Sequence, residues 1–268
     1  MIKYLKYTVS LLLLSFATTN LANAQTASNL EAVERKLVSY YEKMEAFKAG
    51  YDNYDSLEWY GKQFDSLLYN TLKNDPTSIH YAFRKLQDLG VFWIAQSDDK
   101  QLRIYSWDDQ MGGTMRSFNC IYQFEISNGV MVERRITDQD GDPISFYSKI
   151  YTLNRQHLPP VYLAIHNGIY STKDASQSVS AFAIENDTLN KSIKIFKTKN
   201  EYLNTIDVYF DFFSVADRPE RPLELITFDK ASKKLFIPIV TEDGKVTKRN
   251  IIYQYDGTYL KHILSEKK

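Results

Sequence analysis

The chain has 268 residues, in which 33 Lys and Arg balance 33 Asp and Glu, and 44% of the residues are apolar. This apolar content is typical of a folded globular protein and too high for a disordered one. The zero formal charge argues against a dedicated nucleic-acid binder, which usually carries a basic excess. One Cys and four scattered His argue against a disulfide scaffold, a zinc finger and a c-type haem site.

The first 24 residues have the pattern of a secretory signal peptide. Lys3 and Lys6 form a cationic start, an apolar stretch follows at 8–17, and residues 22–24 (Ala-Asn-Ala) form a small-x-small site. The stretch has about ten residues, whereas a membrane span needs roughly 20. We therefore expect cleavage after Ala24, export to the periplasm or the medium, and no transmembrane segment in the mature chain. Cleavage removes two Lys and no acidic residue, so the formal charge falls from zero to −2. A retained N-terminal anchor is the alternative.

Residues 25–90 are predicted to be helical, because apolar residues recur there at three- and four-residue steps. Ser28 and Glu31 have the spacing of a capping box at the start of the first helix. The apolar stripe of this helix comprises Leu30, Val33, Leu37, Tyr40, Met44 and Phe47. The stripe of the second helix comprises Leu57, Tyr60, Phe64, Leu67 and Thr71. A third, shorter helix is expected after Asp75-Pro76, and Gly90 is well placed to end it.

Residues 91–268 are predicted to form strands, because short alternating runs are separated by turn sequences such as Asn128-Gly129 and Asn167-Gly168. Residues 204–213 alternate most clearly, and Cys120 lies on the apolar face of its strand, where we expect it to be buried. Strands at short spacing with no helices between them favour antiparallel pairing. We therefore expect an α+β fold in which the helices cover a mainly antiparallel sheet, open or partly closed, within one structural unit.

A possible ligand-binding surface lies near the second predicted strand. Arg103, Tyr105 and Trp107 share one strand face, which could stack on a sugar ring or a peptide, with Asp108 and Arg116 as hydrogen-bonding partners. The alternative is that the two aromatic rings pack beneath the helices and the guanidinium group lies across them.

Most catalytic and metal motifs are missing from the sequence. There is no His-Glu-x-x-His helix, no Gly-x-Ser-x-Gly elbow and no phosphate-binding loop. The acidic run at 138–142 lacks the glycine and glutamate positions of a calcium loop. His166 is a candidate functional residue beside a turn, although hydrogen bonding to the turn explains it more economically. Acidic pairs, such as Asp108 with Asp109 or Asp207 with Asp211, would suit a hydrolase only at the correct separation.

Residues 97–108, together with 112–116, resemble a segment of uncharacterised secreted proteins from Bacteroidetes-type bacteria. The signal peptide and the frequent use of Tyr, Asn and Lys are similar to those proteins. The resemblance is strong over roughly twenty residues and loose elsewhere. It implies export from a bacterial cell, and it implies no activity, cofactor or site residue.

The sequence favours a periplasmic or secreted binding module that works without a cofactor and binds a glycan, a peptide or another envelope protein. The export signal, the aromatic strands and the missing catalytic motifs support this reading. The alternative is an exported hydrolase that acts on glycan or peptide through paired carboxylates. A structural component of the envelope is the third possibility, and an exposed apolar patch would be its sign.

Overall fold

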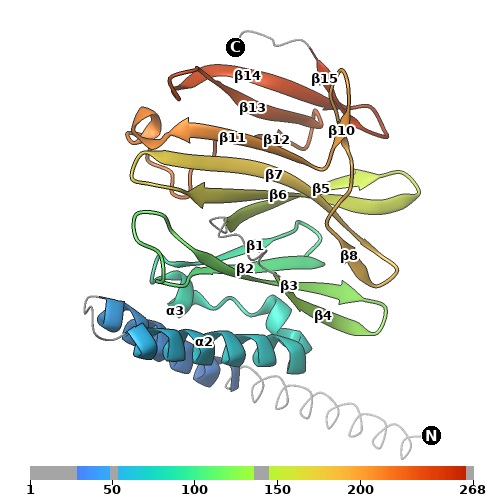
Figure 1. Ribbon diagram of the computed structural model, residues 1–268. Helices are drawn as coiled ribbons and strands as arrows, with labels where there is room; N and C mark the ends of the chain where they lie inside the picture. The colour runs from blue at the N-terminus through green and yellow to red at the C-terminus, as the bar shows by residue number, and fades with distance from the viewer. Residues whose placement is uncertain (1–28, 49–53, 136–144, 264–268) are drawn as a thin grey trace, which may run out of the picture.

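The computed structural model describes residues 29–48, 54–135 and 145–263. A layer of helices lies against a stack of three β-sheets (Figure 1). The chain runs from the helices through the first sheet to the second, enters the third sheet at residues 196–203, returns to the second at 205–211 and ends in the third. The predicted signal peptide, its cleavage site and the acidic run at 138–142 lie outside the described residues. In the part of the chain that is described, no helix is long and apolar enough to cross a membrane.

Two helices form the first layer, as the apolar periodicity predicts. Residues 29–48 are helical, and α2 follows at Tyr54–Asn74. The buried face of the first helix comprises Leu30, Leu37, Tyr41 and Met44. The buried face of α2 comprises Leu57, Phe64, Leu68 and Leu72. Both faces pack onto the first sheet and form one hydrophobic cluster with its side chains. Tertiary burial of this kind supplies most of the stability of short helices.

The predicted third helix is divided into two shorter pieces. A 3-10 helix, η1, spans Pro76–His80, and a one-turn helix, α3, spans Arg84–Gln87. The break falls at Phe83, a fully buried residue that has a left-handed backbone conformation with a φ of 46°. The carboxylate of Glu34, on the first helix, accepts hydrogen bonds from the backbone N–H of Lys85 (2.7 Å) and from the Tyr81 hydroxyl (2.8 Å). A contact from another helix therefore stabilises the start of α3.

The first sheet, which we call the helix-covered sheet, is an antiparallel meander with the order β1-β2-β3-β4. Its strands are β1 (Phe92–Gln96), β2 (Leu102–Asp108), β3 (Phe118–Ile126) and β4 (Gly129–Arg134). All seven residues of β2 are buried, because the helices cover one face of the strand and the next sheet covers the other. Cys120 is buried in β3, as expected.

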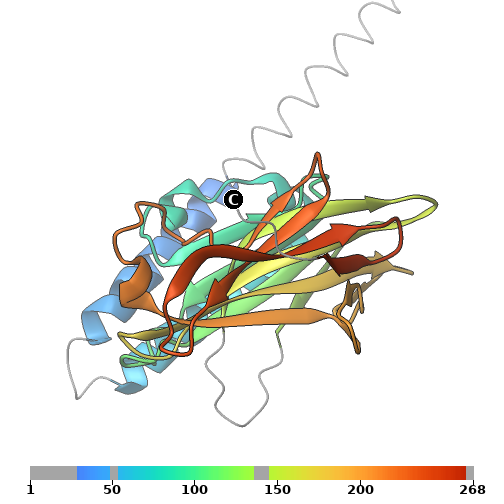
Figure 2. The ribbon, with the colours of Figure 1, turned by 90° about the horizontal axis from the view of Figure 1, so that it is seen from above.

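The second sheet, which we call the middle sheet, has the order β11-β7-β6-β5, and β8 pairs with β7. Its strands are β5 (Phe146–Arg155), β6 (Leu158–Ile169), β7 (Asp174–Glu185), β8 (Thr188–Asn190) and β11 (Thr205–Asp211). One face packs on the helix-covered sheet and the other on the outer sheet. Seen from above, the long strands of the stacked sheets run broadly along one direction (Figure 2).

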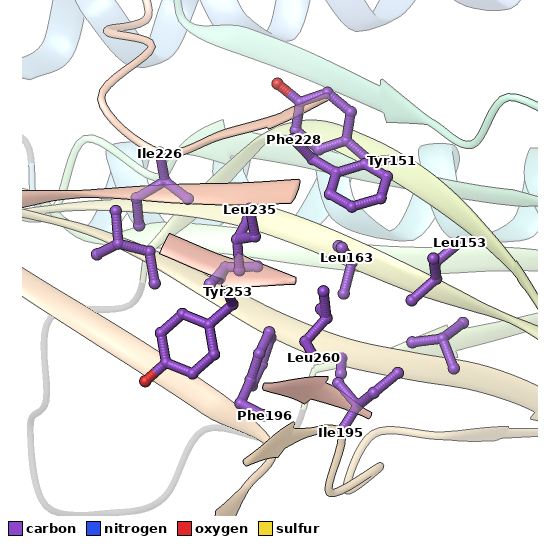
Figure 3. Packing of buried hydrophobic residues seen from close by; sticks show 14 of the residues in the cluster. Tyr151, Leu153, Leu163, Ile195, Phe196, Ile226, Phe228, Leu235, Tyr253 and Leu260 are labelled. Carbon is purple, nitrogen blue, oxygen red and sulfur yellow. The ribbon is translucent and has the colours of Figure 1, made fainter. Parts of the chain in front are cut away.

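The third sheet, which we call the outer sheet, has the order β10-β9-β15-β14-β13-β12. Its strands are β9 (Phe196–Lys197), β10 (Tyr202–Leu203), β12 (Thr227–Asp229), β13 (Lys234–Val240), β14 (Val246–Tyr255) and β15 (Leu260–Ile263). β15 runs parallel to β9, and every other described strand pair is antiparallel. Figure 3 shows the core that this sheet shares with the middle sheet, where Leu163 lies among Phe196, Leu235 and Leu260.

The structure confirms the predicted α+β class, with N-terminal helices and a strand-rich, mainly antiparallel remainder. The prediction did not include the division of the strands into three stacked sheets. Each strand pair within the meanders follows from local turns, whereas the stacking depends on contacts between residues far apart in the chain.

Candidate binding cleft

The strand face that was predicted to bind a ligand lies in the interior of the protein. Tyr105 and Trp107 are 0% exposed, and Arg103 is 4% exposed. The Trp107 ring lies beside Phe64 of α2, with their centroids 5.3 Å apart. The Arg103 guanidinium lies 5.2 Å from the centre of the Tyr105 ring and donates to the Ile79 carbonyl at 2.8 Å. This is the packing alternative, and it corrects the expectation of a ligand-binding face at these three residues.

The other two predicted ligand contacts, Asp108 and Arg116, form an ion pair with each other. Nη1 of Arg116 lies 2.9 Å from Oδ2 of Asp108, whose Oδ1 accepts the backbone N–H of Gln110 at 2.8 Å. The neighbouring Asp109 accepts the hydroxyl of Ser117 at 2.7 Å, and burial raises the pKa of its carboxyl group. The two carboxylates therefore fix the loop between β2 and β3, which carries Arg116 toward a cleft.

The cleft has a volume of about 500 Å³ and lies where four segments meet. The segments are the β2–β3 loop, the start of β5, the end of the β6–β7 hairpin, and the end of β11 with the chain that follows it to β12. Its apolar lining comprises Phe146, Ile169, Ala175, Phe210, Phe212, Pro222 and Leu223. Its other lining residues are Gly113, Thr114, Arg116, Asn167, Gly168, Ser171, Thr172, Ser176 and Arg221. A mostly apolar cavity of this size with a few polar groups is typical of a small-molecule binding site.

The hairpin wall of the cleft depends on Gly168. Asn167-Gly168 was predicted to be a turn, but β6 continues to Ile169. A Cβ atom on Gly168 would lie 2.8 Å from Oγ of Ser176 and 2.9 Å from the hydroxyl of Tyr170. These two oxygens are 3.1 Å apart and hydrogen-bonded. A side chain at this position would displace the Tyr170 ring or the Ser176 hydroxyl, so glycine allows the Tyr170 ring to lie across the strand.

The opposite wall is held in place by a buried amide, Gln177 of β7, which is 0% exposed. Its Nε2 donates to the Leu223 carbonyl at 2.6 Å and to Oδ1 of Asn167 at 2.7 Å. Its Oε1 accepts the backbone N–H groups of Leu225 (2.9 Å) and Ile226 (2.7 Å). One side chain thus fixes the segment that carries Leu223 onto the middle sheet.

The segment 212–222 forms the rim of the cleft. The 3-10 helix η2 spans Phe212–Val215, and the guanidinium of Arg221 lies 5.6 Å from the centre of the Phe212 ring. Nη1 of Arg221 donates to the carbonyls of Arg218 (2.6 Å) and Glu220 (2.7 Å). Within the described residues, Arg221 forms no ion pair with a carboxylate.

The charges around the cleft are unequal. Two arginines, Arg116 and Arg221, belong to its lining, and none of the described lining residues is acidic. The nearest carboxylate partner that the structure gives to either arginine is Asp108, which is 5% exposed and lies behind Arg116. The rim therefore favours an anionic group over a cationic one.

His166 lies in a chain of hydroxyl groups on the middle sheet and does not line the cleft. Its Nδ1 is 2.9 Å from Oγ of Ser145, and its Nε2 is 3.0 Å from Oγ of Ser180. Burial and the nearby charge of Arg135 lower the pKa of His166 to about 3. A base with so low a pKa is a weak proton acceptor at neutral pH, so the contact with Ser145 does not resemble an activated nucleophile.

The two acidic pairs that the sequence offered to a hydrolase are poorly arranged for glycoside hydrolysis. Asp207 and Asp211 lie four residues apart on one strand, which separates their Cα atoms by about 13 Å. Glycosidase carboxyl groups lie about 5 to 9.5 Å apart. Asp211 accepts the backbone N–H of Phe213 at 2.9 Å. Asp108 and Asp109 are both engaged in holding the β2–β3 loop.

Sequence analysis selected Arg116 but none of the other residues that line the cleft. The small residues Gly113 and Gly168, which lie on two of the segments that meet at the cleft, were a possible sequence signal for it. Among the described residues, no three His, Cys, Asp or Glu side chains are grouped as they would be to hold a metal ion.

A scan against protein-family models and a search of curated proteins found no match for this chain.

Proposed function

We propose that this protein is an exported binding module that holds an apolar ligand in the cleft without a cofactor. The observation that carries the proposal is the cavity of about 500 Å³, whose exposed lining surface is mainly apolar and which is formed by four separate segments. The signal-peptide pattern of residues 1–24 supports export, as does the resemblance to secreted bacterial proteins.

The lining favours an apolar ligand over a glycan. Four of the apolar residues around the cavity are Phe146, Phe210, Phe212 and Leu223, and none of the described lining residues supplies a carboxylate to a sugar hydroxyl. Burial of apolar ligand surface contributes about 25 cal/mol per Å². A peptide with apolar side chains or a small apolar molecule therefore suits the site better than a sugar.

The proposal is tested with a neutral apolar fluorophore, 1-N-phenylnaphthylamine, titrated into the purified chain that begins at Gln25. We expect saturable binding with increased emission. Thr172 is exposed and lines the cleft, so the substitution Thr172→Trp should fill the cleft and weaken binding at least about tenfold. Thr258→Trp is the matched control, because Thr258 is an exposed turn residue outside the cleft lining.

The result that contradicts the proposal is a fluorophore affinity that is the same in the parent protein, Thr172→Trp and Thr258→Trp. Equal affinities would mean that the fluorophore binds elsewhere. Far-UV circular dichroism of the three proteins checks that the substitutions preserve the fold.

A further inference from the structure

We infer that the ligand of the cleft is an apolar chain that ends in a carboxylate, and that Arg116 binds this carboxylate. The inference rests on the proposed function and adds the chemical class of the ligand. The apolar chain would lie along Phe210, Phe212 and Leu223, which are all part of the lining. The occupant to which we commit is a free acid, such as a medium-chain fatty acid.

The donors of Arg116 are suited to a carboxylate. Its Nη1 is the guanidinium nitrogen that binds Asp108, at 2.9 Å. In the described part of the chain, Nε and Nη2 have no hydrogen-bond partner, and together they form the side-on fork of the group. A guanidinium fork matches the two oxygens of a carboxylate in a bidentate pair. The side chain is 39% exposed, so an incoming ligand can reach it.

Asp108 acts as a positioning residue for this arginine. The Asp108 side chain is 6% exposed, and its second oxygen is occupied by the backbone N–H of Gln110. The carboxylate therefore fixes one end of the guanidinium and leaves the fork of Nε and Nη2 unused. Because Asp108 does not line the cleft, it does not present a negative charge directly to the ligand.

Arg221 adds a second positive charge to the lining of the cleft. Its guanidinium donates to three backbone carbonyls, of Ala216, Arg218 and Glu220, so it is held rigidly over Phe212. Hydrogen bonds to carbonyl groups leave its net charge in place. An anion bound at Arg116 is thus attracted by both arginines, whereas a cation of the same size is repelled.

The test compares three ten-carbon compounds that differ only in their head groups. Decanoate, decanol and decyltrimethylammonium are used below their micelle concentrations to displace 1-N-phenylnaphthylamine from the chain that begins at Gln25. A hydrogen bond to a charged group contributes more to binding than one between neutral groups, so we expect decanoate to act at a concentration at least about tenfold lower than decanol. The cationic compound should be the weakest.

The substitution Arg116→Gln should lower the affinity for decanoate at least about tenfold and change the affinity for decanol little. The matched control is Arg134→Gln, because Arg134 also pairs with an aspartate (Asp65, at 2.8 Å), has a similar side-chain exposure of 42%, and does not line the cleft. If Arg116→Gln destabilises the fold by leaving Asp108 unpaired, the double variant Asp108→Asn/Arg116→Gln removes both charges. The comparison of the three compounds on the parent protein needs no variant.

The possible outcomes separate this inference from the proposed function. Equal displacement of the fluorophore by decanoate and decanol would overturn the inference that the ligand carries a carboxylate. Fluorophore binding that is sensitive to Thr172→Trp would still support the cleft as a binding site. Displacement of the fluorophore by a trileucine peptide with a free C-terminus, but not by decanoate, would overturn the inference that the ligand is a free fatty acid. Absence of fluorophore binding would contradict the proposed function itself.

Discussion

The substitution Gln177→Leu tests the link between the buried polar network and the cleft. Leucine has a similar volume but leaves the Leu223 carbonyl and the backbone N–H groups of Leu225 and Ile226 without their partner. Each buried group that loses its partner costs about 1 to 3 kcal/mol. Since movement of the segment would expose some of these groups to water, we expect a total loss of about 3 to 6 kcal/mol. This is a large fraction of the roughly 5 to 15 kcal/mol that stabilises a typical domain.

The free energy of unfolding is measured by urea titration with circular dichroism, and cleft binding by 1-N-phenylnaphthylamine fluorescence under native conditions. We expect Gln177→Leu to lower both. The matched control is Gln123→Leu, because Gln123 is also 0% exposed and donates to the Leu72 carbonyl and to Ser78, far from the cleft lining. Gln123→Leu should lower stability while the folded protein keeps its affinity. A loss below about 1 kcal/mol with unchanged binding in Gln177→Leu would refute the reasoning.

Three further predictions concern the core, the acid response and export. Trp107→Ala should lower the free energy of unfolding by about 3 to 5 kcal/mol without changing fluorophore affinity in the folded protein; weaker binding at unchanged stability would restore the ligand-binding interpretation of this residue. Since the folded-state pKa of His166 is about 3 and its unfolded value is about 6.5, the unfolded chain binds the extra proton between these values, so stability should fall as pH drops from 6.5 toward 3. In urea titrations, His166→Gln should reduce the dependence of the unfolding free energy on pH. An identical pH profile in both proteins would contradict the attribution of this dependence to His166. When the full-length chain is produced in a bacterium, mass spectrometry of the exported protein should show a mature N-terminus at Gln25. An intact N-terminus would contradict cleavage after Ala24.

Periodicity was sufficient to predict the two long helices and the strand-rich remainder of the chain. Burial of one face of a helix or strand imposes a repeat of apolar residues that the sequence must carry. The break at Phe83 was not predictable in this way, since its left-handed backbone depends on contacts with other elements. The pairing of β9 with β15 was not predictable either, because Phe196 and Leu260 meet only in the folded sheet. Such long-range pairings leave no local signal.

The candidate site was harder to predict than the fold. Tyr105 and Trp107 share one face of β2 with Arg103, as they would in an aromatic binding face, and the helices that cover this face make its two aromatic rings part of the core. Arg116, which the sequence offered as a ligand contact, lines the cleft and pairs with Asp108. The contributions of Gln177 and Arg221 depend on contacts between segments that neither motif nor spacing reveals.

The position of β15 within the outer sheet has a consequence for biosynthesis. This strand, Leu260–Ile263, lies between β9 and β14, so the sheet is continuous only when these residues are present. Each strand of the β1–β4 meander pairs with a strand of the same meander, so these pairs can form as soon as Arg134 has been synthesised. The outer sheet can close only after Ile263 has been synthesised, and a stop codon before Leu260 would leave β9 and β10 separated from the rest of their sheet.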